Sequence, residues 1–569
     1  MAGQPLPPYP FNQDPDRTVS YRQPSPGSVP GPGTQPYTYA AQPPVAQSPA
    51  AQPYAQQPYA EQQYAQQPYT GQPSWQQVQI GAPQPPARKR GRGWLTAIVA
   101  AVIVALIGGG GVYAMTMLSG GGAQPEDVLP SGTMAYVRLD LDPAANQKVA
   151  LFQLARKFSA TRGAFTGDDP RKALFELLRQ GDGDLAKIDY ARDVAPWLGD
   201  RVGLGVLAPK AGSSTPRVVA AVQVTDQEQA RAGVRKLDAD GELKGLAFRE
   251  DYAILAETQA EADAYAKAEP LSRDADFAAD LKAVGEPGVL SFWGDAGKIA
   301  KAAQAAGATS AAEAGTLDMV KGVRFAGALR FDGEYAELTG ISRGGAVQAA
   351  AGAEGARLSR LPATTVGALS VSGLGGLLAD QWPQITAAAD GTMGGRSFSD
   401  FVDLARQSYG LSLPEDLVTL LGGNITLAVD ERGLDGAVPN AGAVLSTDPA
   451  KAQEIVTKIE KFVADSGAGA PQLTKVAADG RLIIAASQQY ADELAADGTL
   501  GGSETFTTAI PDADSATAAL YVDLDKIEKY YLNGLRGEER ANAQALRAIG
   551  LSARRSGDVT SFSLRVLFN

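Results

Sequence analysis

Serine, carboxylate and glycine patterns are the features of this sequence that come nearest to the spacing of catalytic sites. The segment Gly340-Ile341-Ser342-Arg343-Gly344 matches the nucleophile elbow, in which a tight turn presents serine to a histidine base. The 569 residues contain no histidine and no cysteine, which excludes His-dependent triads, thiol nucleophiles, disulfides and Cys/His zinc sites. No Ser-x-x-Lys or Walker A pattern occurs either, so we interpret the Ser342 match as accidental.

The carboxylates remain as the reactive groups present in quantity. Asp238-Ala-Asp240-Gly241-Glu242 and Gly181-Asp182-Gly183-Asp184 carry oxygen ligands for hard cations, but neither has the spacing of a calcium loop. We interpret both as solvated turns. Asp140 and Asp142 share one side of a predicted strand, but nothing equivalent recurs in the second repeat described below.

Two further patterns have structural interpretations. Asp295 and Asp523 each precede a lysine by three residues, and we predict that both cap a helix. Gly203-Leu204-Gly205 resembles part of a dinucleotide fingerprint, but strand packing explains it better. The sequence therefore predicts no catalytic residue, no metal site and no cofactor, and we expect that the protein is not an enzyme. A hydrolase that acts through carboxylates is a distant alternative.

Residues 1–93 are predicted to form a disordered cytoplasmic tail that ends in a basic cluster. Residues 1–87 contain 20 prolines among Gln, Ala, Ser, Gly and Tyr, without an apolar period that could define a buried face. A five-residue repeat places Tyr54, Tyr59, Tyr64 and Tyr69 at equal spacing. The tail is either only a solvated segment or a multivalent, phosphorylatable docking site for a cytoplasmic partner.

Residues 94–118 are predicted to form a transmembrane helix. Their 25 uncharged residues are long enough to cross a hydrocarbon core of about 30 Å. The basic residues Arg88, Lys89, Arg90 and Arg92 come directly before them, and the next basic residue is Arg138. The positive-inside rule therefore places the N-terminus in the cytoplasm and the C-terminal part outside the cell. The lipid bilayer is then the first expected partner.

Small residues recur at four-residue spacing within the predicted span. A ridge of this kind lets two helices approach closely, so self-association through the span is a hypothesis. Its members are Ala97, Ala101, Ala105 and Gly109. Residues 119–126 form a Gly-rich tether to the ectodomain.

Comparison of the remaining sequence with itself predicts two tandem repeat units, residues 127–346 and 347–569. Five blocks recur in the same order, among them DVAPWLGDRVGL at Asp193 and DLVTLLGGNITL at Asp416. Asp332-Gly333 and Ser556-Gly557 predict equivalent hairpin turns. Helix starts are predicted at a capping box of Thr225 with Glu228 and at Asp448-Pro449. Strands joined by hairpins, with helices between them, predict an α+β fold whose mainly antiparallel sheets are packed by helices.

The net charge of -12 is distributed unevenly. Residues 1–93 carry +3 and the rest carries -15. An acidic surface of this size repels the phosphate backbone, so we expect no nucleic-acid binding.

The start of the first unit, VLPSGTMAYVRLDLDP from Val128 to Pro143, with Gln147-Lys148 and Phe158, resembles an actinobacterial family of single-pass, membrane-anchored proteins. That family is catalogued only as a domain of unknown function. The resemblance implies a protein of a Gram-positive cell envelope and supplies no substrate, cofactor or catalytic residue.

Together these observations predict a membrane-anchored extracytoplasmic binding protein. Its ligand would be a lipid, a glycan or a small solute, held in a cleft between the two units. The alternative is a structural adaptor that links a cytoplasmic complex, through the tail, to an envelope partner.

Overall fold

The computed structural model describes residues 123–167, 169–181, 185–237, 244–305, 322–344, 355–390, 397–436, 438–465 and 473–569. Here "first half" means the described residues up to 344 and "second half" those from 355. The predicted tail and span, including Arg88, Lys89, Arg90, Arg92 and the ridge from Ala97 to Gly109, lie outside the described residues. Within the described part, no helix is both long and apolar enough to cross a membrane.

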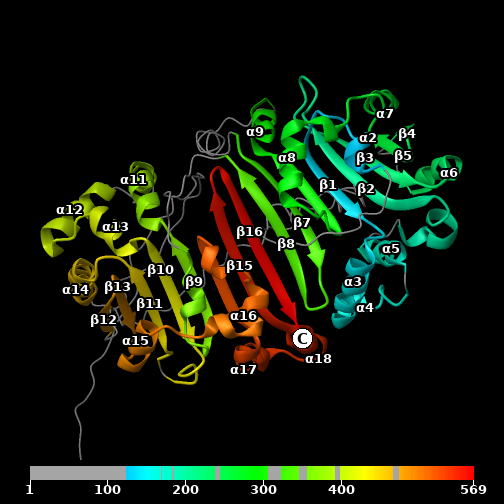
Figure 1. Ribbon diagram of the computed structural model, residues 1–569. Coiled ribbons are helices and arrows are strands. Elements are labelled where there is room, and N and C mark those ends of the chain that lie inside the picture. Colours follow the sequence, from blue (N-terminus) through cyan, green and yellow to red (C-terminus); the bar gives the residue numbers. More distant parts are fainter. Residues whose placement is uncertain are drawn as a thin grey trace, which may run out of the picture. The chain divides into compact units, whose positions relative to one another are not determined.

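Among the described residues, sixteen strands form one antiparallel sheet (Figure 1). The first half contributes β1 Thr133–Asp140, β2 Leu198–Leu207, β3 Arg217–Val224, β4 Gly245–Arg249, β5 Tyr252–Ala256, β6 Leu290–Asp295, β7 Arg324–Phe331 and β8 Tyr335–Arg343. The second half contributes β9 Thr365–Ser372, β10 Asn424–Asp430, β11 Ala441–Ser446, β12 Thr474–Ala478, β13 Arg481–Ala485, β14 Ala518–Asp523, β15 Leu546–Ser556 and β16 Val559–Phe568.

The two halves have the same strand order. From the outer edge to the middle, each half runs through its fourth, fifth, third, second, first, sixth, seventh and eighth strands. The last strands, β8 and β16, pair antiparallel over their full length and join the halves. We expected mainly antiparallel sheets packed by helices; the halves share a single continuous sheet. The fold is α+β, as the sequence predicts.

Helices fill the connections between the strands. The first half contains α2 Pro125–Val128, α3 Ala145–Lys157, α4 Ser159–Arg162, α5 Pro170–Gly181, α6 Gln227–Leu237, α7 Gln259–Tyr265, α8 Ala275–Val284 and α9 Ala296–Ala305. The second half contains α11 Leu374–Asp390, α12 Phe398–Tyr409, α13 Glu415–Leu421, α14 Pro449–Asp465, α15 Gln488–Ala495, α16 Glu504–Ala509, α17 Glu528–Tyr531 and α18 Gly537–Gln544. Short helical turns occur at Leu185–Lys187, Tyr190–Val194, Leu271–Arg273, Leu358–Arg360, Leu500–Gly502, Ala513–Ser515, Asp525–Ile527 and Leu532–Gly534.

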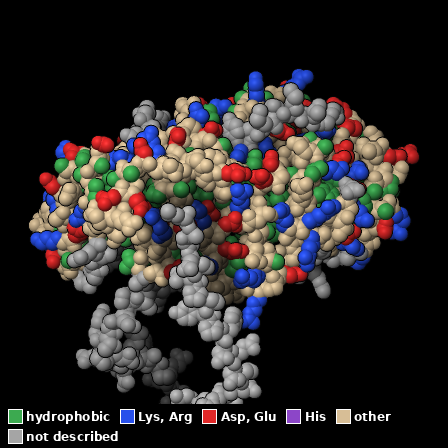
Figure 2. All heavy atoms as spheres, turned by 60° about the horizontal axis from the view of Figure 1, so that its bottom comes forward, with side chains coloured by type: hydrophobic (Ala, Val, Ile, Leu, Met, Phe, Trp, Pro, Cys, Tyr) green, Lys and Arg blue, Asp and Glu red, His purple; other side chains and the backbone are tan. Residues whose placement is uncertain are grey.

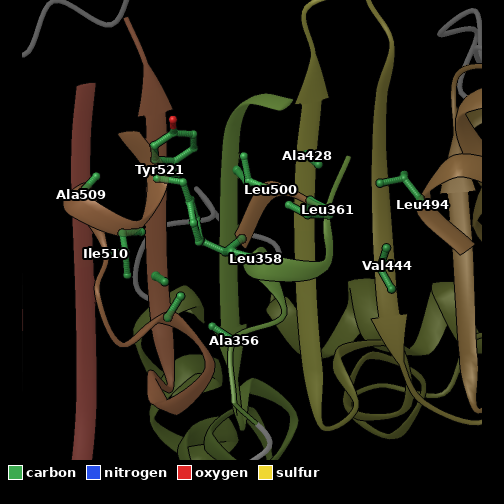
Figure 3. Packing of buried hydrophobic residues seen from close by; sticks show 14 of the residues in the cluster. Ala356, Leu358, Leu361, Ala428, Val444, Leu494, Leu500, Ala509, Ile510 and Tyr521 are labelled. Carbon is green, nitrogen blue, oxygen red and sulfur yellow. The ribbon is translucent and has the colours of Figure 1, made fainter. Parts of the chain in front are cut away.

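One face of the sheet, called the core face here, carries the two largest hydrophobic cores. In the first half, Tyr136 and Trp293 pack against Phe277 of α8. In the second half, Tyr521 packs against Phe506 of α16. Figure 3 shows the second-half core, where Leu358, Leu361 and Leu500 from the connecting turns lie over the strands. Successive side chains along a strand point to opposite faces of the sheet. The residues directly before and after each core residue therefore lie on the other face, called the open face here.

Equivalent contacts recur in the two halves. Asp193 pairs with Lys236 of α6 at 2.7 Å, and Asp416 pairs with Lys458 of α14 at 3.6 Å. These contacts attach equivalent helices at equivalent places, as the repeated sequence blocks led us to expect.

The local predictions are mostly confirmed, with one correction. Both hairpins form, and α14 begins at Pro449 with Asp448 accepting from the N–H groups of Ala450 and Lys451. The predicted capping box at Thr225 is wrong. Asp226 caps α6 through the N–H groups of Glu228 and Gln229, whereas the Thr225 hydroxyl donates to the Pro196 carbonyl.

Candidate binding surface

Leucines occupy the same level of nine neighbouring strands on the open face. Each pairs in register with the leucine of the next strand, so that they form one unbroken row from β10 to β1. The members of this leucine row are Leu427, Leu369, Leu520, Leu551, Leu564, Leu338, Leu329, Leu290 and Leu139. None of the nine is fully buried. At a strand spacing of about 4.8 Å, the row is about 38 Å long.

Small residues beside the leucines leave two adjoining hollows at the second-half end of the row. One, of about 550 Å³, is bordered by Gly367, Ala441 and Leu427. The other, of about 360 Å³, is bordered by Ala518 and Ala553. Both hollows share Leu369 and Leu520, so together they follow the leucine row.

The lining of the hollows is apolar throughout. Tyr521 is the one lining residue with a polar side chain, and its hydroxyl donates to Asp523 on the core face instead. The backbone beneath is paired within the sheet. A sugar or a small polar solute needs hydrogen-bond partners that this surface does not offer. An apolar ligand needs none.

Aromatic rings fill the neighbouring level of the open face near the middle of the sheet. Phe292 lies over Gly327, Phe325 over Gly294, and Phe562 over Gly340, each opposite in register. A Cβ at Gly327 or Gly340 would come within 2.4 Å of a phenylalanine ring, so glycine is required there. Of these rings, Phe562 forms one wall of the smaller hollow.

The two halves differ in how far the open face is covered. In the first half, Leu204 is 7% exposed because it packs beneath Trp197 and Val234 of α6. Its equivalent, Leu427, is 43% exposed, and Leu369 is 40% exposed. The residue equivalent to Trp197 is the smaller Leu420, and the cluster beneath α14, the helix equivalent to α6, does not include Leu427. The hollows thus arise where the second half lacks a cover that the first half has.

The core face beneath the row carries a line of buried charges. Arg330, Glu337 and Arg565 lie opposite one another on β7, β8 and β16. Arg330 donates to the Val284 carbonyl at the end of α8, and Arg565 donates to the Thr508 carbonyl in α16. Cations are favoured at helix C-termini, which explains how two guanidinium groups are accommodated inside the protein.

The carboxylates singled out in the sequence make structural contacts within the fold. Asp295 accepts from the N–H group of Lys298 at the start of α9, which confirms the predicted cap. Asp523 accepts from the N–H group of Lys526, but this residue lies in the short turn Asp525–Ile527, whose cap position is Leu524. Asp140 pairs with Arg138 at 2.7 Å, and burial raises the pKa of Asp140 despite the arginines nearby. Asp140 lies on the core face, so its carboxyl does not face the leucine row.

The other sequence motifs have structural roles or lie outside the described residues. Ser342 lies within β8 rather than at a strand-to-helix turn, and Arg343 pairs with the buried Asp280. Gly203 allows Pro125 of α2 to pack closely on β2. The segments 182–184 and 238–242 are not described. Among the described residues, no cluster of carboxylates has the arrangement of a metal site. On the face shown in Figure 2, basic and acidic side chains are interspersed.

Sequence reasoning missed the leucine row. Each leucine is visible in the sequence, but the register that aligns them is set by pairing between strands up to about 230 residues apart, such as Leu338 with Leu564. We expected a cleft between the units; both hollows described here are lined by the second half, and the row crosses the junction.

A family model described as a protein of unknown function (DUF3352) matches residues 97–262. The match covers the first half from α2 to β5, and it confirms the expected resemblance to a domain of unknown function over these residues. No curated protein matches the chain, and neither does any solved structure.

Proposed function

We propose that the protein is a membrane-anchored binding protein of a bacterial cell envelope, and that its ligand is the acyl chain of a lipid. The leucine row carries this proposal. Its nine side chains form a strip about 38 Å long, more than the roughly 30 Å of a whole hydrocarbon core, so an extended chain fits along it. The predicted span at residues 94–118 would keep this strip beside a source of lipid.

The chemistry of the row selects this ligand from the three classes that the sequence left open. Glycans and small polar solutes would lose hydrogen bonds with water and gain none from the hollows. An acyl chain loses none, and each methylene that leaves water contributes about 0.8 kcal/mol. The repeated strand order supports a duplicated ectodomain, and the exposure of Leu369 and Leu427 favours the second half as the main contact.

Photocrosslinking tests the proposal directly. The full-length protein would be reconstituted in vesicles containing a phospholipid with a diazirine on its acyl chain, irradiated and digested. We expect labelled peptides from β9, β10 and β14, and their labelling should fall when unlabelled lipid is added. Label on the predicted span serves as an internal positive control. Labelled span peptides with unlabelled β9, β10 and β14 would contradict the proposal.

A further inference from the structure

Helices α11 and α12 expose apolar side chains that a folded domain usually covers. Leu404 is 56% exposed, Ile385 39% and Phe401 38%. In α12, Ala405 is the one buried residue. Contiguous exposed apolar surface of this kind marks an interaction site.

Aromatic rings of α11, α12 and α14 form a series of contacts that includes Phe401. The ring centroids of Trp382 in α11 and Phe398 in α12 are 5.8 Å apart, and those of Phe398 and Phe401 are 5.9 Å apart. Phe462 of α14 contacts both Phe401 and Tyr409. Trp and Tyr are enriched where proteins meet the interface between water and lipid.

The equivalent helix of the first half is built differently. Helix α3, which follows β1 as α11 follows β9, buries Leu151, Phe152 and Leu154 and carries three basic residues. Helix α11 carries two charges, Asp380 and Asp390, in 17 residues, and its leucines are only partly buried. A helix that is apolar on most sides belongs inside a protein or against lipid.

The chain length before the described part limits what this surface can meet. The predicted span ends at Leu118, and the Ala123 carbonyl accepts a hydrogen bond from Tyr252, 2.9 Å away. Five residues reach at most about 18 Å when fully extended. With residues 94–118 as the membrane anchor of the proposed function, this length keeps Ala123 within about 18 Å of the bilayer.

We propose that the exposed face of α11 and α12, at Ile385, Phe401 and Leu404, rests in the lipid headgroup region. This inference depends on the membrane anchor of the proposed function. Helix α13, which packs on α11, contributes Leu420 to the cluster that includes Ala443 and Ile484 beside the larger hollow. Lipid would thus meet the protein next to the leucine row.

The charges near this surface define how it would bind. Asp380, Asp400 and Asp403 outnumber Arg406, so attraction to anionic lipid contributes nothing. The contact is made by apolar burial, and it should be insensitive to salt.

A spin-label experiment tests the inference. Because the chain contains no cysteine, the label attaches only to the introduced residue. Leu404→Cys and Val149→Cys would each be labelled with a nitroxide in the full-length protein, in uncharged phosphatidylcholine vesicles that mostly hold a single copy. Val149 is a matched control because it lies on α3 and is 55% exposed. We expect a severalfold lower collision rate with a water-soluble nickel complex at position 404 than at 149, a higher rate with oxygen, and no change in high salt.

Two results would overturn the inference. One is equal nickel accessibility at both positions. The other is protection of position 404 that appears only at high protein density, which would indicate a second copy of the chain as the partner. Alkaline carbonate extraction of the same vesicles separates both results from failure of the membrane anchor, because a chain without an anchor would be released from the vesicles.

Discussion

Arg565 of β16 lies directly opposite Glu337 of β8, with 2.5 Å between Nε and Oε1, and both side chains are buried where the two halves meet. The sequence neighbours, Leu564 and Leu338, face the other way and belong to the leucine row. The junction therefore carries an ion pair on the core face and an apolar strip on the open face. At the position related by the repeat, Ser561 lies opposite Ile341, so the ion pair occurs once.

Removing Glu337 should destabilise the protein strongly. Glu337→Leu leaves the buried guanidinium group of Arg565 without its carboxylate, and we expect a loss of about 3 to 5 kcal/mol in unfolding free energy. Glu337→Leu combined with Arg565→Leu should recover part of this loss. Urea unfolding followed by tryptophan fluorescence measures both.

The control for this prediction is Asp142→Asn, which removes a surface pair with Lys148. It should change the unfolding free energy by less than about 1 kcal/mol. If Glu337→Leu costs no more than Asp142→Asn, the junction does not depend on the ion pair.

Two substitutions at the start of α6 test whether Asp226 or Thr225 caps this helix. Asp226→Ala removes the acceptor for two backbone N–H groups and should cost about 1 kcal/mol. Thr225→Ala removes only a hydroxyl that donates to Pro196 and should cost less than about 0.5 kcal/mol. The reverse order in thermal or urea unfolding would restore Thr225 as the cap.

Acid should weaken the second half through Asp430. Burial alone would raise the pKa of this carboxyl, but hydrogen bonds from Arg432 and Thr364 outweigh burial and lower it. Because the folded pKa lies below the unfolded value of about 3.9, the stabilisation is complete above that pH and is lost as the pH falls through the folded pKa.

Urea unfolding between about pH 2 and pH 6, the range over which carboxylates titrate, measures this effect. Asp430→Asn should flatten the decline of the unfolding free energy on acidification, whereas Asn at the exposed Asp403 should leave it unchanged. Equal acid sensitivity in all three proteins would show that the Asp430 contacts contribute nothing.

Local structure was readable from the sequence where neighbouring residues decide it. Asp332-Gly333 fixes a hairpin, and proline after Asp448 fixes a helix start. The Thr225 prediction failed because Thr225 and Asp226 are both good caps, and the choice depends on the contact of Thr225 with Pro196. The predicted cap at Asp295 succeeded because a carboxylate at the end of a strand meets the next N–H groups directly.

The candidate binding surface depends on long-range pairing. Leu204 and Leu427 occupy equivalent strands in similar apolar sequences, yet one is buried and the other exposed. The difference comes with the covering side chain, Trp197 in the first half and the smaller Leu420 in the second, and the sequence of the strand itself does not contain it. The junction of β8 with β16 likewise joins residues 228 positions apart, such as Glu337 and Arg565.

The most direct test of the central claim is the lipid content of the full-length protein purified from its native membrane. Native mass spectrometry with lipid extraction would compare the natural protein with Leu369→Glu and with Leu178→Glu, a control residue of similar exposure on α5. We predict a stoichiometric acyl lipid on the natural protein and on Leu178→Glu, and its loss from Leu369→Glu. Equal lipid on all three proteins, or none on any of them, would contradict binding along the leucine row.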